Sequence, residues 1–123
     1  MVITAALASN GCFSLFDCAD EPKYTTASPS GRRTATVAIR NCGATTGITT
    51  VVTVSQKRFG LYNASRELFG ADGEVAGDRY FTLRWASDDE LVVTVNAPIV
   101  LFRADKPLSD LTARYEGSPK FGS

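Results

Sequence analysis

Histidine does not occur anywhere in the 123 residues of this chain. It is the side chain that most often acts as a base near neutral pH, and it is the commonest metal ligand in proteins. Its absence excludes catalysis by a serine–histidine or cysteine–histidine pair, and it excludes zinc sites built on imidazole. We therefore expect a protein without enzymatic activity, with no catalytic residues, no cofactor and no bound metal.

A surplus of charge of either sign is also missing, because 13 Lys and Arg residues balance 13 Asp and Glu residues. Proteins that bind nucleic acid without sequence preference need clustered, surplus basic residues to neutralise phosphates. The balance therefore argues against nucleic acid as a partner. Hydrophobic residues make up 44% and charged residues 21% of the chain, a composition that is typical of one globular domain at this length.

Long apolar runs are absent as well. Residues 2–7 are mostly apolar, but this run is far shorter than the roughly 20 residues that span a bilayer, and no Lys or Arg precedes it as in a signal peptide. We interpret residues 1–17 as the remnant of a leader or membrane anchor, with Cys12 as the candidate for lipid attachment. The alternative is a frayed first strand or helix of a soluble protein.

The three cysteines allow one disulfide and leave one residue over. Cys18 and Cys42 both adjoin polar, turn-forming residues, and a bond between them would stabilise the fold by about 3 kcal/mol through the lost entropy of the unfolded chain. Such bonds persist in oxidising compartments, so the pair agrees with the apolar leader and predicts a periplasmic or cell-envelope location. The alternative is a cytoplasmic protein with three reduced cysteines.

Alternation of apolar and polar side chains predicts an all-β fold. Ala35, Val37 and Ile39 share one face of a strand over 33–41, a β-branched run follows over 48–55, and 80–85 with 91–95 form the clearest hairpin. Trp85 in that hairpin needs a partner for its indole N–H if it is buried. We predict an antiparallel meander, forming a small sandwich or open barrel of about six strands, with residues 18–116 as one domain and 117–123 as a frayed tail.

Between residues 56 and 78 the alternation stops, and four glycines fall between positions 60 and 77. We predict a long exposed connection there, with a short helical turn near 63–69. Connections of this length are usually functional or mobile. Basic and aromatic residues interleave in it, and they are our candidates for contact with a protein partner: Lys57, Arg58, Phe59, Tyr62, Arg66 and Phe69. The alternatives are that the aromatic rings cover the core or stack on nucleic-acid bases.

Two short segments have residues that could carry chemistry. Cys42 precedes glycines and threonines, as a nucleophile in an anion-binding turn would, but no base stands near it in the sequence. A disulfide-bonded turn is the simpler interpretation. Asp88, Asp89 and Glu90 form the densest carboxylate group, but the twelve-residue calcium-loop spacing is absent. We interpret them as an exposed hairpin turn.

Three motifs occur together in this order: the turn Ser28-Pro29-Ser30-Gly31, the stretch Cys42-Gly43-Ala44-Thr45-Thr46-Gly47, and the strand–turn–strand Leu83-Arg84-Trp85-Ala86-Ser87-Asp88-Asp89-Glu90-Leu91. In this combination the chain resembles a family of small bacterial proteins of unknown function, many of them lipoproteins. That family has Ser-Pro-Asp-Gly where this chain has Ser at position 30. The resemblance covers roughly residues 18 to 116, and it implies an exported β domain tethered to a membrane.

Together these features predict an exported, non-enzymatic β domain at the cell envelope, which binds a protein partner and has a membrane tether at its N-terminus. One alternative is a cytoplasmic inhibitor of the kind that phages and mobile elements encode, which binds a protein partner. The other is a small hydrolase or thiol enzyme that uses Cys42.

Overall fold

The computed structural model describes residues 18–43, 47–58, 61–104 and 110–122, and all regular structure in these ranges is β-strand. The strands are β1 (Ala19–Ala27), β2 (Arg33–Asn41), β3 (Ile48–Arg58), β4 (Leu61–Asp72), β5 (Phe81–Ser87), β6 (Glu90–Val95), β7 (Val100–Arg103), β8 (Thr112–Gly117) and β9 (Lys120–Phe121). No helix among the described residues is long and apolar enough to cross a membrane. Residues 1–17, with Cys12, lie outside the described residues.

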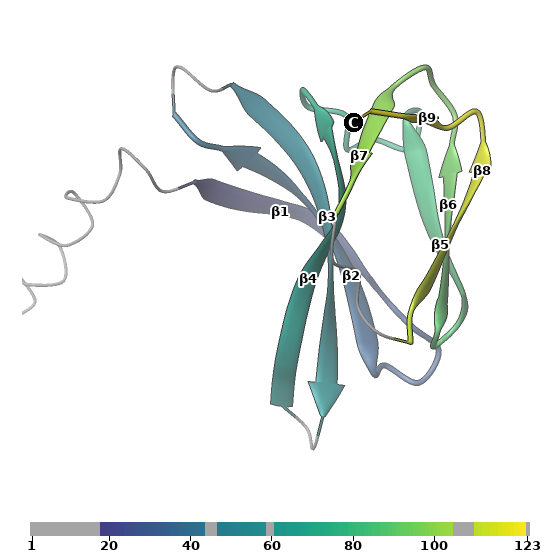
Figure 1. The fold of residues 1–123 in the computed structure, drawn as a ribbon. Coiled ribbons are helices and arrows are strands. Elements are labelled where there is room, and N and C mark those ends of the chain that lie inside the picture. The colour runs from purple at the N-terminus through teal and green to yellow at the C-terminus, as the bar shows by residue number, and fades with distance from the viewer. Residues whose placement is uncertain (1–17, 44–46, 59–60, 105–109, 123) are drawn as a thin grey trace, which may run out of the picture.

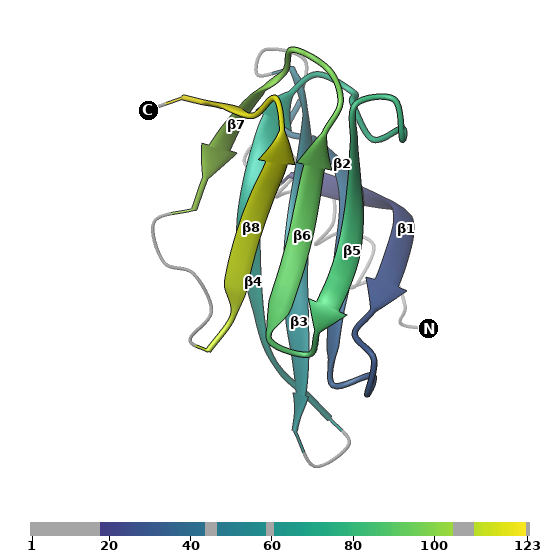
Figure 2. The ribbon, with the colours of Figure 1, turned by 90° about the vertical axis from the view of Figure 1, so that its right-hand side faces the viewer.

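The strands form two sheets that face each other as the layers of a sandwich (Figures 1 and 2). The larger sheet has the order β1-β2-β3-β4-β7-β9, and the smaller one has the order β5-β6-β8. Neighbouring strands are antiparallel, except that β6 is parallel to β8 and β7 is parallel to β9. The predicted all-β fold is confirmed. The described residues form nine strands in place of about six, and the chain leaves the smaller sheet for β7 and returns to it in β8.

The core lies between the sheets and is built by the alternation that the sequence indicates. Ala35 and Val37 of β2 face Leu91 and Val93 of β6 across the interior, and all four side chains are fully buried. Both predicted hairpins are present, since β2 pairs with β3 and β5 pairs with β6 in antiparallel register. Full burial of a Val or Leu side chain such as these stabilises the fold by about 1.5 to 3 kcal/mol.

The segment 56–78, predicted to be a long connection, is largely strand, and the prediction of a helical turn near 63–69 is wrong. β4 pairs with β3 from the hairpin tip to Asp72, and only after it does an irregular segment begin. Leu68 and Phe69 are adjacent in sequence and yet both are buried, because the ladder with β3 has a bulge at this point. A bulge turns two successive side chains to one side, and it therefore erases the alternation by which a strand is recognised.

The tail predicted to be frayed over 117–123 instead carries β9, which pairs with β7. Phe121 packs edge-on against Tyr115 of β8, with the ring centroids 5.1 Å apart. Gly117 makes the turn into this segment with φ +87°. The strands therefore continue past residue 116, because pairing with β7 and the contacts of the Phe121 ring anchor a strand that has no alternation of its own.

Candidate functional site

Two turns from different sheets are joined at one end of the sandwich. Ser30, in the turn between β1 and β2, donates its backbone N–H to Oδ1 of Asp88 in the β5–β6 turn, at 3.0 Å. This hydrogen bond is the largest of several contacts that lower the pKa of the Asp88 carboxyl below its usual value. The acidic turn is therefore a contact between the sheets, and it brings the Ser28–Gly31 turn and the Leu83–Leu91 hairpin together.

Arg33 fills the space between these turns and is only 2% exposed. Its Nη1 lies 3.2 Å from Oδ1 of Asp89 and donates to the backbone carbonyl oxygens of Asp88 and Asp110. Its Nε donates to the side chain of Gln56. A charge is tolerated in the interior when it is paired and hydrogen-bonded, and these partners come from both sheets and from the segment before β8. Arg33 therefore fastens this end of the sandwich.

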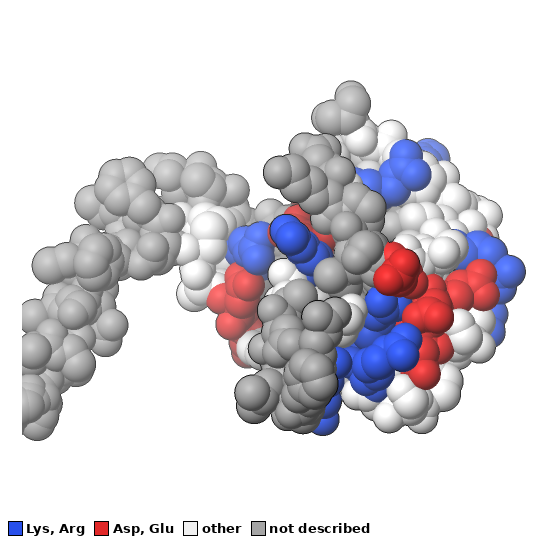
Figure 3. All heavy atoms as spheres, turned by 60° about the horizontal axis from the view of Figure 1, so that its bottom comes forward, with Lys and Arg blue, Asp and Glu red and all other residues white. Residues whose placement is uncertain are grey.

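Charges of both signs lie beside one another at this end, as Figure 3 shows. Arg32 also reaches Asp89, with 2.8 Å between Nη2 and Oδ1. Arg32 and Arg33 thus face Asp88 and Asp89, and the two pairs of charges cancel. These ion pairs and hydrogen bonds hold the two sheets together at this end of the molecule.

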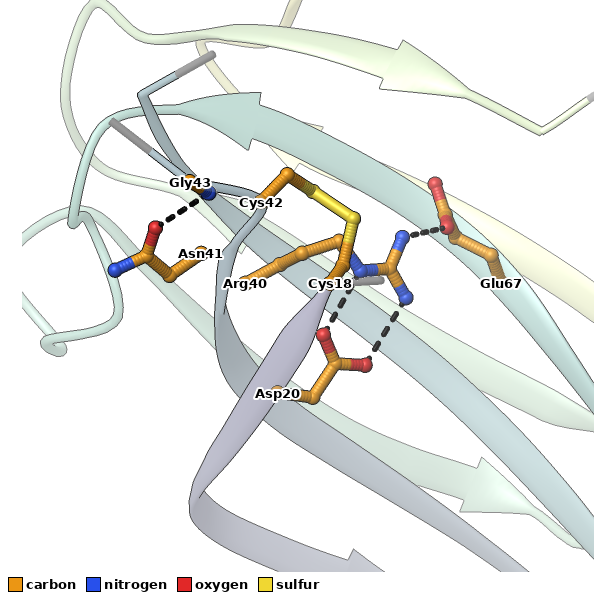
Figure 4. Close-up of a disulfide and its surroundings, with 7 residues drawn as sticks. All are labelled: Cys18, Asp20, Arg40, Asn41, Cys42, Gly43 and Glu67. Carbon is orange, nitrogen blue, oxygen red and sulfur yellow. Dashed lines mark hydrogen bonds and ion pairs between the residues drawn. A yellow bond between two sulfur atoms is a disulfide. The ribbon is translucent and has the colours of Figure 1, made fainter. Parts of the chain in front are cut away.

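The predicted disulfide between Cys18 and Cys42 is confirmed (Figure 4). The two residues stand at the open end of the β1–β2 hairpin, next to the facing pair Ala19 and Asn41. Asn41 accepts a hydrogen bond from the backbone N–H of Gly43 and so shapes the turn that follows. With its sulfur bonded, Cys42 carries no thiol in this structure, and its use as a nucleophile would first require reduction.

Arg40 lies beside the disulfide and links three strands through ion pairs (Figure 4). Its guanidinium binds Asp20 of β1 at 2.9 Å and Glu67 of β4 at 3.0 Å, so the side chain reaches across β3. The hydrogen bond from Arg40 is the main reason why the pKa of Asp20 is lowered, and the same bond raises the pKa of Arg40 still further. Arg40 is the cation nearest to Cys42 in the sequence, and its guanidinium is paired with both carboxylates.

Trp85 has the partner that its indole N–H requires. Nε1 donates to the carbonyl oxygen of Thr26 at 2.9 Å, which joins β5 of the smaller sheet to β1 at the edge of the larger one. This contact, the disulfide and the Arg40 ion pairs hold β1 in place, although seven of its nine residues are exposed.

The predicted partner contacts divide among different places. Lys57 and Arg66 are exposed on the two arms of the β3–β4 hairpin, which projects beyond the rest of the sandwich at the bottom of Figure 1. Phe59 lies outside the described residues, as do the side chains of Arg58 and Tyr62. Phe69 is a correction: it is 0% exposed and packs against Phe81 at 5.3 Å. The bulge in β4 turns it into the core, so it cannot touch a partner.

The structure also contains a cleft that the sequence does not predict. The cleft has a volume of about 500 Å³ and lies at the side of the sandwich where β8 is the last strand of the smaller sheet. Leu68, Ala113 and Tyr115 line it, and Arg103 stands in its wall. No motif indicates this cleft, because its walls come from β4, β7 and β8. Arg33, by contrast, could have been found, since it shares the inward parity of Ala35 on the same strand.

No protein-family model matches the sequence, and neither a curated protein nor a solved structure is significantly similar to it.

Proposed function

We propose that this chain is an exported, non-enzymatic β domain of the cell envelope, which binds a protein partner through the tip of the β3–β4 hairpin. The observation that carries the proposal is the Cys18–Cys42 disulfide. Disulfides of this structural kind form and persist outside the reducing cytoplasm. The bond also converts the most reactive side chain of the sequence into part of the scaffold. The resemblance to small bacterial lipoproteins points to the same compartment.

The hairpin is the surface that best suits a protein contact. Its ladder continues past the last pair of β2 with β3, Arg33 with Gln56, as far as Arg58 with Leu61. Exposed Lys57 lies next to a tip whose sequence adds aromatic residues, and exposed Arg66 lies farther along the second arm, opposite Val54. Arginine and aromatic side chains provide most of the binding energy in many protein interfaces, and a projecting hairpin can present them without altering the core.

The location is tested by trapping thiols in living cells. The gene is expressed with its upstream reading frame, and maleimide is added before lysis, so that every free cysteine is blocked where the protein resides. We expect the envelope fraction to contain the protein with Cys18 and Cys42 protected from maleimide, and with Cys12 blocked unless it carries a lipid. Protein in the cytoplasmic fraction with all three cysteines blocked would contradict export and support the cytoplasmic inhibitor or the thiol enzyme.

The binding surface is tested by replacing residues 58–61 with Asn-Gly, which closes a two-residue hairpin on the pair Lys57 and Tyr62. Cross-linking in envelope extract compares this variant with the intact domain and with Arg84→Gln, a matched loss of one exposed arginine on the smaller sheet. We expect a partner that the intact domain and Arg84→Gln capture and the trimmed variant does not. Equal capture by all three would remove the hairpin from the interface.

A further inference from the structure

The two sheets differ in width, and the difference leaves one side of the sandwich open. Six strands face three, and β8 is the last strand of the smaller sheet, whereas the larger sheet continues through β7 and β9. The cleft of about 500 Å³ lies there, and its volume is within the range of ligand sites. Ala113 and Tyr115 turn toward it from alternate positions of β8, while Arg114 between them is exposed.

Among the described residues, the outer edge of β8 has neither a bulge nor a proline, and its charged side chains are Arg114 and Glu116. Bulges, prolines, charged side chains, very short strands and covering segments are the usual protection of a sheet edge against pairing with another chain. β1 has a register shift after Pro22, β9 is two residues long and follows Pro119, and β5 has a register shift and the Trp85 contact to β1. β8 pairs with β6 in unbroken register over Thr112–Gly117. Alternate backbone N–H and C=O groups of such a strand point away from β6, its one partner among the described strands.

Arg103 gives the described lining of the cleft a positive charge. It pairs with Phe69 in the β4–β7 ladder, so its side chain lies on the inner face of the larger sheet, and its guanidinium stacks over the Phe121 ring at 4.2 Å. Among the residues that the structure describes, it forms no ion pair and is the one charged side chain that lines the cleft. A carboxylate placed here would form a partly shielded, charge-assisted pair.

We propose that the edge of β8 accepts an extended peptide segment of another protein, which adds as a fourth strand to the smaller sheet and covers the cleft. Backbone hydrogen bonds to β8 would hold the segment, as in other cases of strand addition. Its alternate side chains would point into the cleft against Leu68 and Tyr115, and one carboxylate would meet Arg103. This surface is separate from the β3–β4 hairpin, so the inference stands or falls independently of the function proposed above.

The probe is a phage-displayed library of random linear dodecapeptides, selected against the folded domain. We expect enriched peptides with apolar residues at alternate positions and at least one Asp or Glu. In the complex, amide exchange should slow at alternate residues of Thr112–Gly117, and the hairpin should show no change. Methylating the peptide nitrogens that face β8 should abolish binding, because a methylated nitrogen cannot donate a hydrogen bond to the edge.

The side-chain part of the proposal is tested by Arg103→Gln, which keeps the shape of the wall and removes the charge. Titration calorimetry with an enriched peptide should show a loss of at least tenfold in affinity, while Arg84→Gln on the outer face of the smaller sheet binds like the wild type. Circular dichroism confirms that both variants are folded.

Five results would overturn the proposal. The first four are the absence of enriched peptides, affinity that is indifferent to Arg103→Gln or to methylation, protection that appears away from β8, and an Arg103-dependent site for decanoate with none for peptides. The fourth result would assign the cleft to a free organic anion. The fifth is a concentration-dependent dimer that protects the β8 edge without added peptide, which would assign the cleft to a second copy of the chain.

Discussion

Removing the disulfide is the most informative perturbation, because the bond holds a strand that the core does little to hold. Cys18 and Cys42 are 24 positions apart, and closing a loop of about this length restricts the unfolded chain by about 3 kcal/mol. β1 is exposed at seven of its nine residues, so apolar packing cannot replace the bond. For a domain of this size, we expect the melting temperature to fall by about 10 °C or more.

The assay compares Cys18→Ala/Cys42→Ala with the bridged protein, both carrying Cys12→Ser so that no free thiol can exchange with the disulfide. Trp85 is the single tryptophan of the chain, and its indole donates to Thr26 of β1. Its fluorescence therefore reports whether β1 is attached. Urea unfolding followed by both fluorescence and circular dichroism separates loss of β1 from loss of the whole fold.

We expect the fluorescence transition of the unbridged variant to begin at a lower urea concentration than the circular dichroism transition. The bridged protein should show coincident transitions and, when unfolded without reduction, no reactive thiol. An unbridged variant that melts within about 1 °C of the bridged one would refute the reasoning, since it would show that strand pairing alone fixes β1.

Three further predictions follow from single residues. Gly117→Ala should destabilise the fold by at least about 2 kcal/mol, because φ is +87° and an added Cβ would overlap the carbonyl oxygen of Val95; thermal melting measures it. Arg33→Met should cost about 3 kcal/mol in urea unfolding, because it removes the partly buried hydrogen bonds from this side chain to the carbonyl oxygens of Asp88 and Asp110. Asp20→Asn should lower the melting temperature at pH 7, and the difference should disappear only as the pH falls through the pKa of Asp20, which the hydrogen bond from Arg40 lowers below its usual value. This contribution is present above the unfolded pKa and lost as the pH falls through the folded pKa.

Each of these predictions has a matched control. Gly77→Ala should be nearly neutral, because an added Cβ there has no neighbour within 4 Å. Arg32→Met removes an exposed ion pair and should cost no more than about 1 kcal/mol. Asp72→Asn, at an exposed position, should change the melting temperature at pH 7 by less than Asp20→Asn does. If a control matches its test variant, the assigned cause is wrong.

The sequence by itself determined the β class, two hairpins and the pairing of the cysteines. Period-two alternation in 33–41 and in the hairpin around Trp85 survives in any β fold, because a strand with one buried face must place its apolar residues at every second position. Arg33 is two positions from Ala35 on the same strand, so the alternation also indicates that the Arg33 side chain points inward. The odd number of cysteines and their polar, turn-like surroundings were enough to select Cys18 and Cys42.

Only the tertiary structure decided β4, β9 and the cleft. A bulge places Leu68 and Phe69 on the same side and destroys the local period, and the partner that makes the bulge favourable lies in another strand. Phe121 is anchored by its ring contact with Tyr115, and the residues next to Phe121 in the sequence do not indicate this contact. The unequal widths of the sheets, and with them the open edge of β8, follow from which strand pairs with which. That choice depends on packing over the whole core, and local sequence does not record it.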